Sequence, residues 1–201
     1  MSFVTKKGYL TIVFGPMFSG KTSYLIESIK NIYLINGLKK VKTFAVVLNH
    51  GTDNRSLNKI GSLTTHNNSF KFSSLPSEVK FLSTTDLRDV YDDLKESDYI
   101  FIDECQFFKN LEETVKKLLK DGKNIMLSGL VTDSDLNPFG EMHNLFPFAD
   151  EVLQKKAYCV YCKTGEKNAS FTKFIGEIPK CEKILVGSEK SFVPVCRFHH
   201  S

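Results

Sequence analysis

The chain has 201 residues, of which 41% are hydrophobic and 25% are charged. This length suits one main domain with a buried core and a small additional module. No apolar run approaches the about 20 residues of a membrane span, and the apolar run near the N-terminus is too short and lacks a cleavage site for a secretion signal. We therefore expect a cytoplasmic protein without a membrane partner. A net charge of +4, spread along the chain, is too small to indicate a nucleic-acid partner.

Apolar runs typical of buried parallel strands alternate with helical patterns along the first three quarters of the chain. The expected strands are 9–14, 43–48, 99–103 and 124–130, and the expected helices are 21–36, 86–95 and 111–120. The sequence thus predicts an α/β domain over residues 1–155, with a parallel sheet flanked by helices. The polar segment 49–74 is expected to be a functional loop. Residues 156–201, with short segments rich in Cys, Gly, Pro and Lys, are expected to form a small second domain.

A glycine-rich phosphate-binding loop is predicted between the first strand and the first helix. The segment GPMFSGKT fits the pattern G-x-x-x-x-G-K-[ST]. In such a loop backbone N–H groups surround the phosphates, Lys21 reaches the β- and γ-phosphates, and the Thr22 hydroxyl ligates Mg²⁺. A glycine turn that occurs by chance is disfavoured by the strand before it and the helix after it. The expected phosphate-binding residues are Gly15, Pro16, Met17, Phe18, Ser19, Gly20, Lys21 and Thr22.

The segment YIFIDECQFF places two carboxylates after an apolar strand. Asp103 has the position of an acid that holds Mg²⁺ through water, and Glu104 is the candidate general base. Alone, each could be an ordinary turn or surface residue, but beside a phosphate loop they favour phosphoryl transfer or nucleotide hydrolysis. Arg55, in the polar loop, could stabilise the transferring phosphoryl group or could be a solvated side chain. Arg88 lies beside two aspartates, so ion pairing explains it better.

Four metal-ligand residues occur in two spaced pairs, Cys159 with Cys162 and Cys196 with His199. This spacing is typical of a tetrahedral Zn²⁺ site, and four protein ligands would make the zinc structural. A redox dithiol is the alternative, and His200 competes with His199 as the fourth ligand. Cys181 is expected to be a bystander in the loop between the pairs, and Cys105 a buried thiol at a strand end and not a nucleophile.

Taken together, the segments GPMFSGKT, Asp53-Asn54-Arg55, DECQFF, SGL…NPFG and YCVYC…VCRFHH resemble the type II thymidine kinases in order and spacing, over residues 9–199. The resemblance implies a RecA-like P-loop α/β core with a zinc-bearing lasso domain, usually in a homotetramer. It also implies transfer of the γ-phosphate of ATP to the 5′-hydroxyl of thymidine or deoxyuridine, with dTTP as feedback inhibitor.

The resemblance further implies roles for individual residues. Glu104, Arg55 and Lys21 would be catalytic, and the contacts to ATP and Mg²⁺ would come from 15–22, Asp53, Arg55, Asp103 and Gln106. The nucleoside would be surrounded by Met17, Phe107, Leu130, Ser134, Phe139, Thr172, Lys183, Ile184, Leu185, Val186, Gly187 and Phe192. Three positions depart from the family pattern: Val131 replaces an aspartate, Ser134 an aromatic residue and Phe192 a tyrosine. Phe139 is the candidate to compensate for the aromatic contact.

Three alternatives to a thymidine kinase stay open at this point. The departures allow a deoxynucleoside kinase with altered or broader base choice. A P-loop ATPase or nucleic-acid-binding module is disfavoured by the small net charge and by the presence of only three arginines. An inactive zinc-stabilised scaffold fits poorly with the intact set Lys21, Thr22, Asp103 and Glu104.

Overall fold

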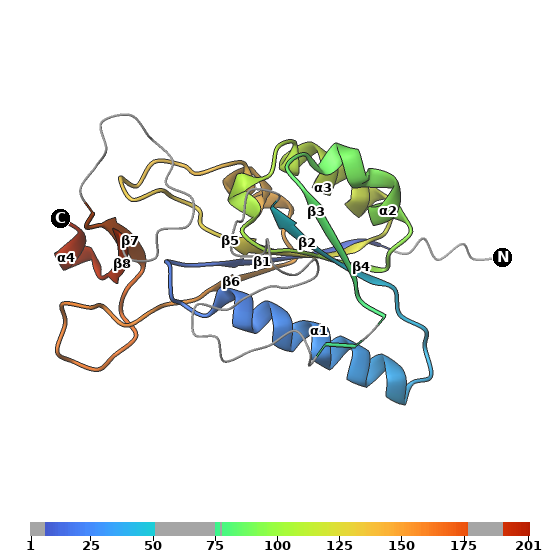
Figure 1. Cartoon of the computed structure of the whole chain (residues 1–201), viewed down its shortest axis with the longest axis horizontal. Helices are drawn as coiled ribbons and strands as arrows, with labels where there is room; N and C mark the ends of the chain where they lie inside the picture. The colour runs from blue at the N-terminus through green and yellow to red at the C-terminus, as the bar shows by residue number, and fades with distance from the viewer. Residues whose placement is uncertain (1–6, 51–74, 77, 177–190) are drawn as a thin grey trace.

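The computed structural model describes residues 7–50, 75–76, 78–176 and 191–201 (Figure 1). Its strands are β1 (Tyr9–Phe14), β2 (Ala45–His50), β3 (Lys80–Thr84), β4 (Tyr99–Ile102), β5 (Asn124–Gly129), β6 (Glu151–Gln154), β7 (Phe171–Phe174) and β8 (Phe192–Val195). Its α-helices are α1 (Lys21–Leu38), α2 (Tyr91–Lys95), α3 (Leu111–Lys120) and α4 (Arg197–His200). Within the described ranges, 3₁₀ segments cover Leu87–Val90, Cys105–Phe107 and Met142–Phe148.

Six strands form one sheet in the order β3-β2-β4-β5-β1-β6, and every pair in it is parallel. The phosphate loop follows β1 and Asp103 follows β4, while β5 lies between these two strands. Because the strands are parallel, their carboxyl ends meet at one edge of the sheet, where ligands bind in open α/β folds. The sheet therefore brings the loop and the acidic segment to the same edge.

The core has two layers, one on each face of the sheet. In Figure 1, α1 covers one face and α2 and α3 cover the other. Side chains alternate between the faces along each strand, so Ile100 and Ile102 of β4 belong to one apolar cluster with Leu111 of α3. Phe101, between them, belongs to the other cluster with Leu25 of α1. A strand that is apolar at every position is thus buried on both faces, as parallel strands are.

Beyond the sheet, β7 and β8 pair antiparallel and precede α4 (Figure 1). Ala157, Cys159, Ala169 and Val195 form the small buried cluster of this C-terminal module. Four residues give little apolar area, so the module depends on other bonds for its stability.

The expected fold class, a parallel sheet flanked by helices with a Cys/His cluster near the C-terminus, is confirmed. Strand β2 begins and ends two residues later than expected, so its last two residues belong to the sheet and not to the polar loop. The expected helix 86–95 is a 3₁₀ turn followed by the short α2, and the Asp86 side chain caps the turn by accepting a hydrogen bond from the backbone of Arg88. Strands β3 and β6 were not predicted. No helix in the described ranges is long and apolar enough to cross a membrane.

Candidate active site and metal cluster

The phosphate loop, residues 15–22, connects β1 to α1 through residues with unusual backbone angles. A Cβ atom at Gly15 would overlap the carbonyl oxygen of Lys155, so only glycine fits there. Phe18 and Gly20 have left-handed φ angles of 63° and 82°. Gly20 caps α1 without a side-chain hydrogen bond, which leaves the first N–H groups of this 18-residue helix available to an anion.

Two side chains of the loop are held in place by hydrogen bonds. Lys21, with 7% of its surface exposed, donates from Nζ to the carbonyl oxygen of Pro16 at 2.9 Å. Thr22 donates from its hydroxyl to Oδ2 of Asp103 at 2.8 Å. Burial lowers the pKa of Lys21, although the nearby carboxylates of Glu104 and Asp103 act in the opposite direction. Burial and then the charge of Glu104 raise the pKa of Asp103 to about 6.

Three buried oxygen atoms around the loop lack a hydrogen-bond partner within the described part of the chain. They are Oγ of Ser19, Oδ1 of Asp103 and Oγ of Ser128, at the end of β5. Ser128 is close enough to Asp103 to favour its ionised form, but the two side chains do not meet in hydrogen-bond geometry. Buried polar atoms are nearly always satisfied, so unsatisfied ones at a glycine-rich loop indicate a polar ligand. A phosphate chain with its Mg²⁺ supplies suitable partners, because it presents both acceptors and a cation with ordered water.

The acidic turn after β4 places Glu104 and Gln106 on the same side as the loop. Glu104 has a left-handed backbone with φ 49° and accepts a hydrogen bond at Oε2 from Nε2 of Gln106 at 2.7 Å. Gln106 in turn accepts from the backbone N–H of Leu130 at 2.9 Å. Cys105 is fully buried, as expected, and contacts the sulfur of Met142; burial raises the pKa of its thiol. A thiol with these surroundings is unreactive.

Hydrogen bonds between described residues join the C-terminal module to the core. The backbone N–H of Met17, in the phosphate loop, donates to Oγ1 of Thr172 in β7 at 3.0 Å. His200 lies with Nε2 at 2.9 Å from the carbonyl oxygen of Ser134. The structure thus brings Met17 and Thr172 together, and it turns His200 toward the segment after β5.

The structure brings together only some of the residues that are expected to surround the nucleoside. Phe107 and Phe139 pack edge to face, with ring centroids 5.3 Å apart, and His50 lies 5.7 Å from Phe107. Phe192, in β8, packs on Phe174 of β7 at 5.1 Å, within the C-terminal module. Asp53, Arg55 and Lys183 to Gly187 lie outside the described residues, as does Cys181.

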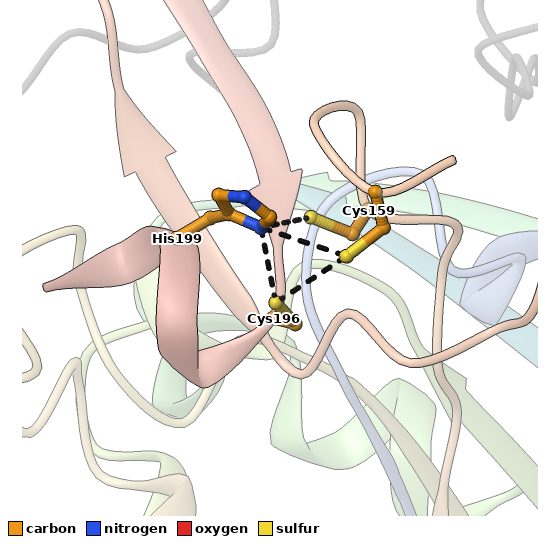
Figure 2. A group of neighbouring side chains, drawn as sticks. Cys159, Cys196 and His199 are labelled. Carbon is orange, nitrogen blue, oxygen red and sulfur yellow. Dashed lines mark hydrogen bonds between the residues drawn. The ribbon is translucent and has the colours of Figure 1, made fainter. Parts of the chain in front are cut away.

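The Cys/His cluster gathers all four expected ligand residues, Cys159, Cys162, Cys196 and His199. Figure 2 shows the His199 ring facing the sulfur atoms of Cys159 and Cys196. Nδ1 of His199 lies 3.4, 3.5 and 3.3 Å from the sulfurs of Cys159, Cys162 and Cys196, and the last two sulfurs are 3.7 Å apart. His199, and not His200, therefore points into the cluster.

These separations fit a tetrahedral zinc ion. With Zn–S bonds of about 2.3 Å and a Zn–N bond of about 2.05 Å, tetrahedral angles place two sulfurs about 3.8 Å apart and a sulfur about 3.5 Å from the nitrogen. Burial opposes ionisation of Cys159, but several hydrogen bonds with the backbone outweigh it and lower the pKa of this thiol to about 6. A thiolate is the form that binds a metal.

Two residues at the site were missed from the sequence. Ser128 is the serine of the segment SGL…NPFG and lies at the end of β5, so its strand-end position was an available signal, although no role was assigned to it. His50 ends β2 and contacts Phe107, in the 3₁₀ turn after β4, only because β2 and β4 are neighbours in the sheet, and the sequence carries no signal for that pairing.

The fold and the site define a P-loop nucleotide-binding protein that carries a potential structural metal cluster. Comparison with known proteins narrows this class. The family model described as thymidine kinase matches residues 8–200. The chain therefore belongs to the thymidine kinase family.

Individual relatives agree with this assignment. A protein of Amsacta moorei entomopoxvirus named thymidine kinase is 33% identical over 190 residues, which cover 94% of this chain and 95% of that protein. A thymidine kinase of Mycoplasma genitalium is 32% identical over 203 residues, 100% of this chain and 86% of that protein. One of Pseudothermotoga lettingae is 33% identical over 193 residues, 94% and 93% of the two chains. The similarity thus extends over both the sheet and the C-terminal module.

Proposed function

We propose that the protein transfers the γ-phosphate of ATP to the 5′-hydroxyl of thymidine and deoxyuridine. The observation that carries the proposal is the placement of Glu104 in the turn directly after Asp103, which Thr22 of the phosphate loop contacts at 2.8 Å. Membership of the thymidine kinase family supports the nucleoside as the phosphate acceptor. The geometry alone would also suit hydrolysis of ATP, in which a water molecule takes the place of the nucleoside hydroxyl. Membership of the thymidine kinase family favours transfer to a nucleoside over hydrolysis.

In this proposal the chain's own groups bind, orient and move one proton. The N–H groups of the phosphate loop and the Lys21 ammonium hold the β- and γ-phosphates. Thr22 and Asp103 would hold Mg²⁺, which neutralises charge on the phosphate oxygens when it is bound. The Glu104 carboxylate accepts the proton of the 5′-hydroxyl as the oxygen forms its bond to the γ-phosphorus. The bond from that phosphorus to the β-phosphate oxygen breaks, and ADP leaves with the electron pair.

We also propose residues for nucleoside binding. Phe107 and Phe139, which already contact each other, would pack against the base or sugar, together with Leu130. Met17 and Thr172 would close the other side, since their hydrogen bond places β7 beside the phosphate loop. Ser134, Phe192 and 183–187 complete the nucleoside set that the family resemblance implies, and Arg55 would act on the transferring phosphoryl group.

Zinc has a structural role in this proposal. Three cysteines and one histidine fill the four positions of a tetrahedral ion and leave none for substrate. The ion would join the segment near Cys159 to α4 and thereby fix β7 beside the phosphate loop. Cysteine ligands must stay reduced, which agrees with a cytoplasmic location. A homotetramer and inhibition by dTTP are further proposals from the resemblance, to be tested by light scattering and by inhibition assays.

The decisive experiment measures transfer from Mg-ATP to thymidine, deoxyuridine, deoxycytidine and deoxyguanosine, with hydrolysis of ATP alone as background. Transfer restricted to the first two nucleosides supports the proposal. Transfer to the others as well would favour a kinase with broader base choice. Hydrolysis without transfer to any nucleoside would refute the proposal.

The role of Glu104 is tested separately with Glu104→Gln, and with Glu113→Gln on the exposed face of α3 as the matched control. We expect Glu104→Gln to reduce kcat by about 100-fold to 10,000-fold while Mg-ATP still binds, because a general base contributes this much. Full activity in Glu104→Gln would exclude Glu104 as the base.

A further inference from the structure

Gln106 is a buried residue of the acidic turn whose side-chain amide is engaged at both ends. Only 3% of its surface is exposed. Its Oε1 accepts from the backbone N–H of Leu130 at 2.9 Å, and its Nε2 donates to Oε2 of Glu104 at 2.7 Å. A backbone N–H can only donate, so Leu130 determines which end of the amide is oxygen. The amide nitrogen must then face Glu104.

The surroundings leave Gln106 no other orientation. At Gly129, a Cβ atom would lie 2.5 Å from Oε1 of Gln106, so the end of β5 lies directly against the amide. At Gly140, which has a left-handed φ of 65°, a Cβ atom would overlap the backbone carbonyl of Gln106. Two glycines thus permit close contact with the side chain and with the backbone of one glutamine. Close packing against the end of β5 therefore restricts the movement of the Gln106 amide.

The Glu104 carboxylate needs a partner that fixes its position, because its own turn does little to restrict the side chain. It begins the 3₁₀ turn Cys105–Phe107 in a left-handed conformation, with φ 49° and ψ 43°, and its side chain is only half buried. In the ranges that the structure describes, no second hydrogen bond to its carboxylate accompanies the one from Gln106. A carboxylate held at one oxygen keeps the other oxygen, Oε1, available to accept a proton.

We propose that Gln106 is a positioning residue that aims the Glu104 carboxylate. The inference rests on the proposed function, in which Glu104 is the base. The Oε1 of Gln106 is occupied by the Leu130 N–H and one N–H of its amide by Glu104, which leaves a second N–H of the amide. The backbone N–H of Leu130, directly after β5, fixes the amide of Gln106, and the amide in turn fixes the Glu104 carboxylate.

Kinetics distinguish positioning from phosphate binding. We expect Gln106→Leu to lower kcat about 10-fold to 100-fold, the range in which a misplacement of about 1 Å falls, with little change in KM for Mg-ATP. The matched control is Asn36→Leu, which removes an amide hydrogen-bonded to Thr43 at 2.9 Å beside the C-terminal end of α1. A rise in KM for Mg-ATP at unchanged kcat would overturn the inference in favour of direct phosphate contact.

A double-mutant cycle with Glu104→Asp tests whether Gln106 acts through Glu104. The shorter aspartate keeps a carboxylate but withdraws it from the amide, so Gln106→Leu should have little further effect in that background. An equal loss in both backgrounds would refute positioning while leaving Glu104 as the base. Unchanged activity of Glu104→Asp and of Glu104→Gln would instead refute the proposed base itself, so the two failures are distinguishable.

A second variant keeps the test valid if Gln106→Leu does not fold. Gln106→Glu retains the acceptor for Leu130 and places a second carboxylate beside Glu104. Two adjacent carboxylates resist ionisation, so the acid limb of the kcat profile should move to higher pH. An acid limb identical to that of the unmodified enzyme would contradict the positioning role.

Discussion

The hydrogen bond from Met17 to Thr172 ties the phosphate loop to the C-terminal module, and Thr172→Val tests it. Valine keeps the shape of threonine but removes the oxygen that accepts the Met17 N–H at 3.0 Å. Thr172 is 5% exposed, so water cannot easily replace that oxygen. Leaving the N–H unsatisfied should lower the free energy of unfolding by about 1–2 kcal/mol. For a chain of about 200 residues this corresponds to a fall in Tm of about 2–8 °C.

The matched control is Thr172→Ser, which keeps the hydroxyl and loses one methyl group. Its buried methyl is worth about 0.8 kcal/mol, so both variants should be less stable than the unmodified protein. Kinetics separate them: KM for Mg-ATP should rise about fivefold in Thr172→Val, the equivalent of about 1 kcal/mol, and stay near its original value in Thr172→Ser. Melting curves and initial-rate kinetics provide the measurements. Equal KM values for the two variants would refute the idea that this bond orders the phosphate loop.

Three further outcomes are expected. Elemental analysis should find one zinc ion per chain in the unmodified protein and less than one in Cys162→Ser, because only three of the four ligands at the cluster remain. The melting temperature of Cys162→Ser should fall for the same reason. Gly140→Ala should lose about 1–3 kcal/mol in urea unfolding, because its Cβ overlaps the Gln106 carbonyl, whereas Gly165→Ala, with a similar φ of 66° and open space, should lose less. Burial raises the pKa of Asp103 to about 6, so the folded protein favours the protonated carboxyl group. The contribution of Asp103 to stability is therefore largest at low pH and is lost as pH rises through about 6. Asp103→Asn should raise the Tm of the ligand-free protein more at pH 8 than at pH 5.

The sequence predicted the elements whose signals are local. The phosphate loop is recognisable because the backbone at its glycines excludes other residues, as at Gly15, where the carbonyl of Lys155 leaves no room for a Cβ atom. Strand β4 is recognisable because every residue is apolar up to Asp103. The metal ligands could be chosen from spacing, and only the choice between His199 and His200 needed coordinates.

Elements without a local signal were missed. Strand β3 lies at one edge of the sheet and β6 at the other, and both have a mixture of exposed and half-buried residues that resembles a loop. Contacts such as Met17 with Thr172 join residues 155 positions apart, and no periodic pattern records them. The same is true of Gln106, whose partner Leu130 is known only after β4 and β5 are seen to be neighbours.

The position of β5 between β1 and β4 gives this strand the role of a spacer. The phosphate loop stands on one side of its carboxyl end and the acidic turn on the other, so the width of β5 sets the gap between the group that holds the phosphates and the group that takes the proton. The strand ends in Ser128 and Gly129, two of the smallest residues, where Gln106 packs against it. Bulkier residues there would push the two halves of the site apart, although no catalytic residue would have been replaced.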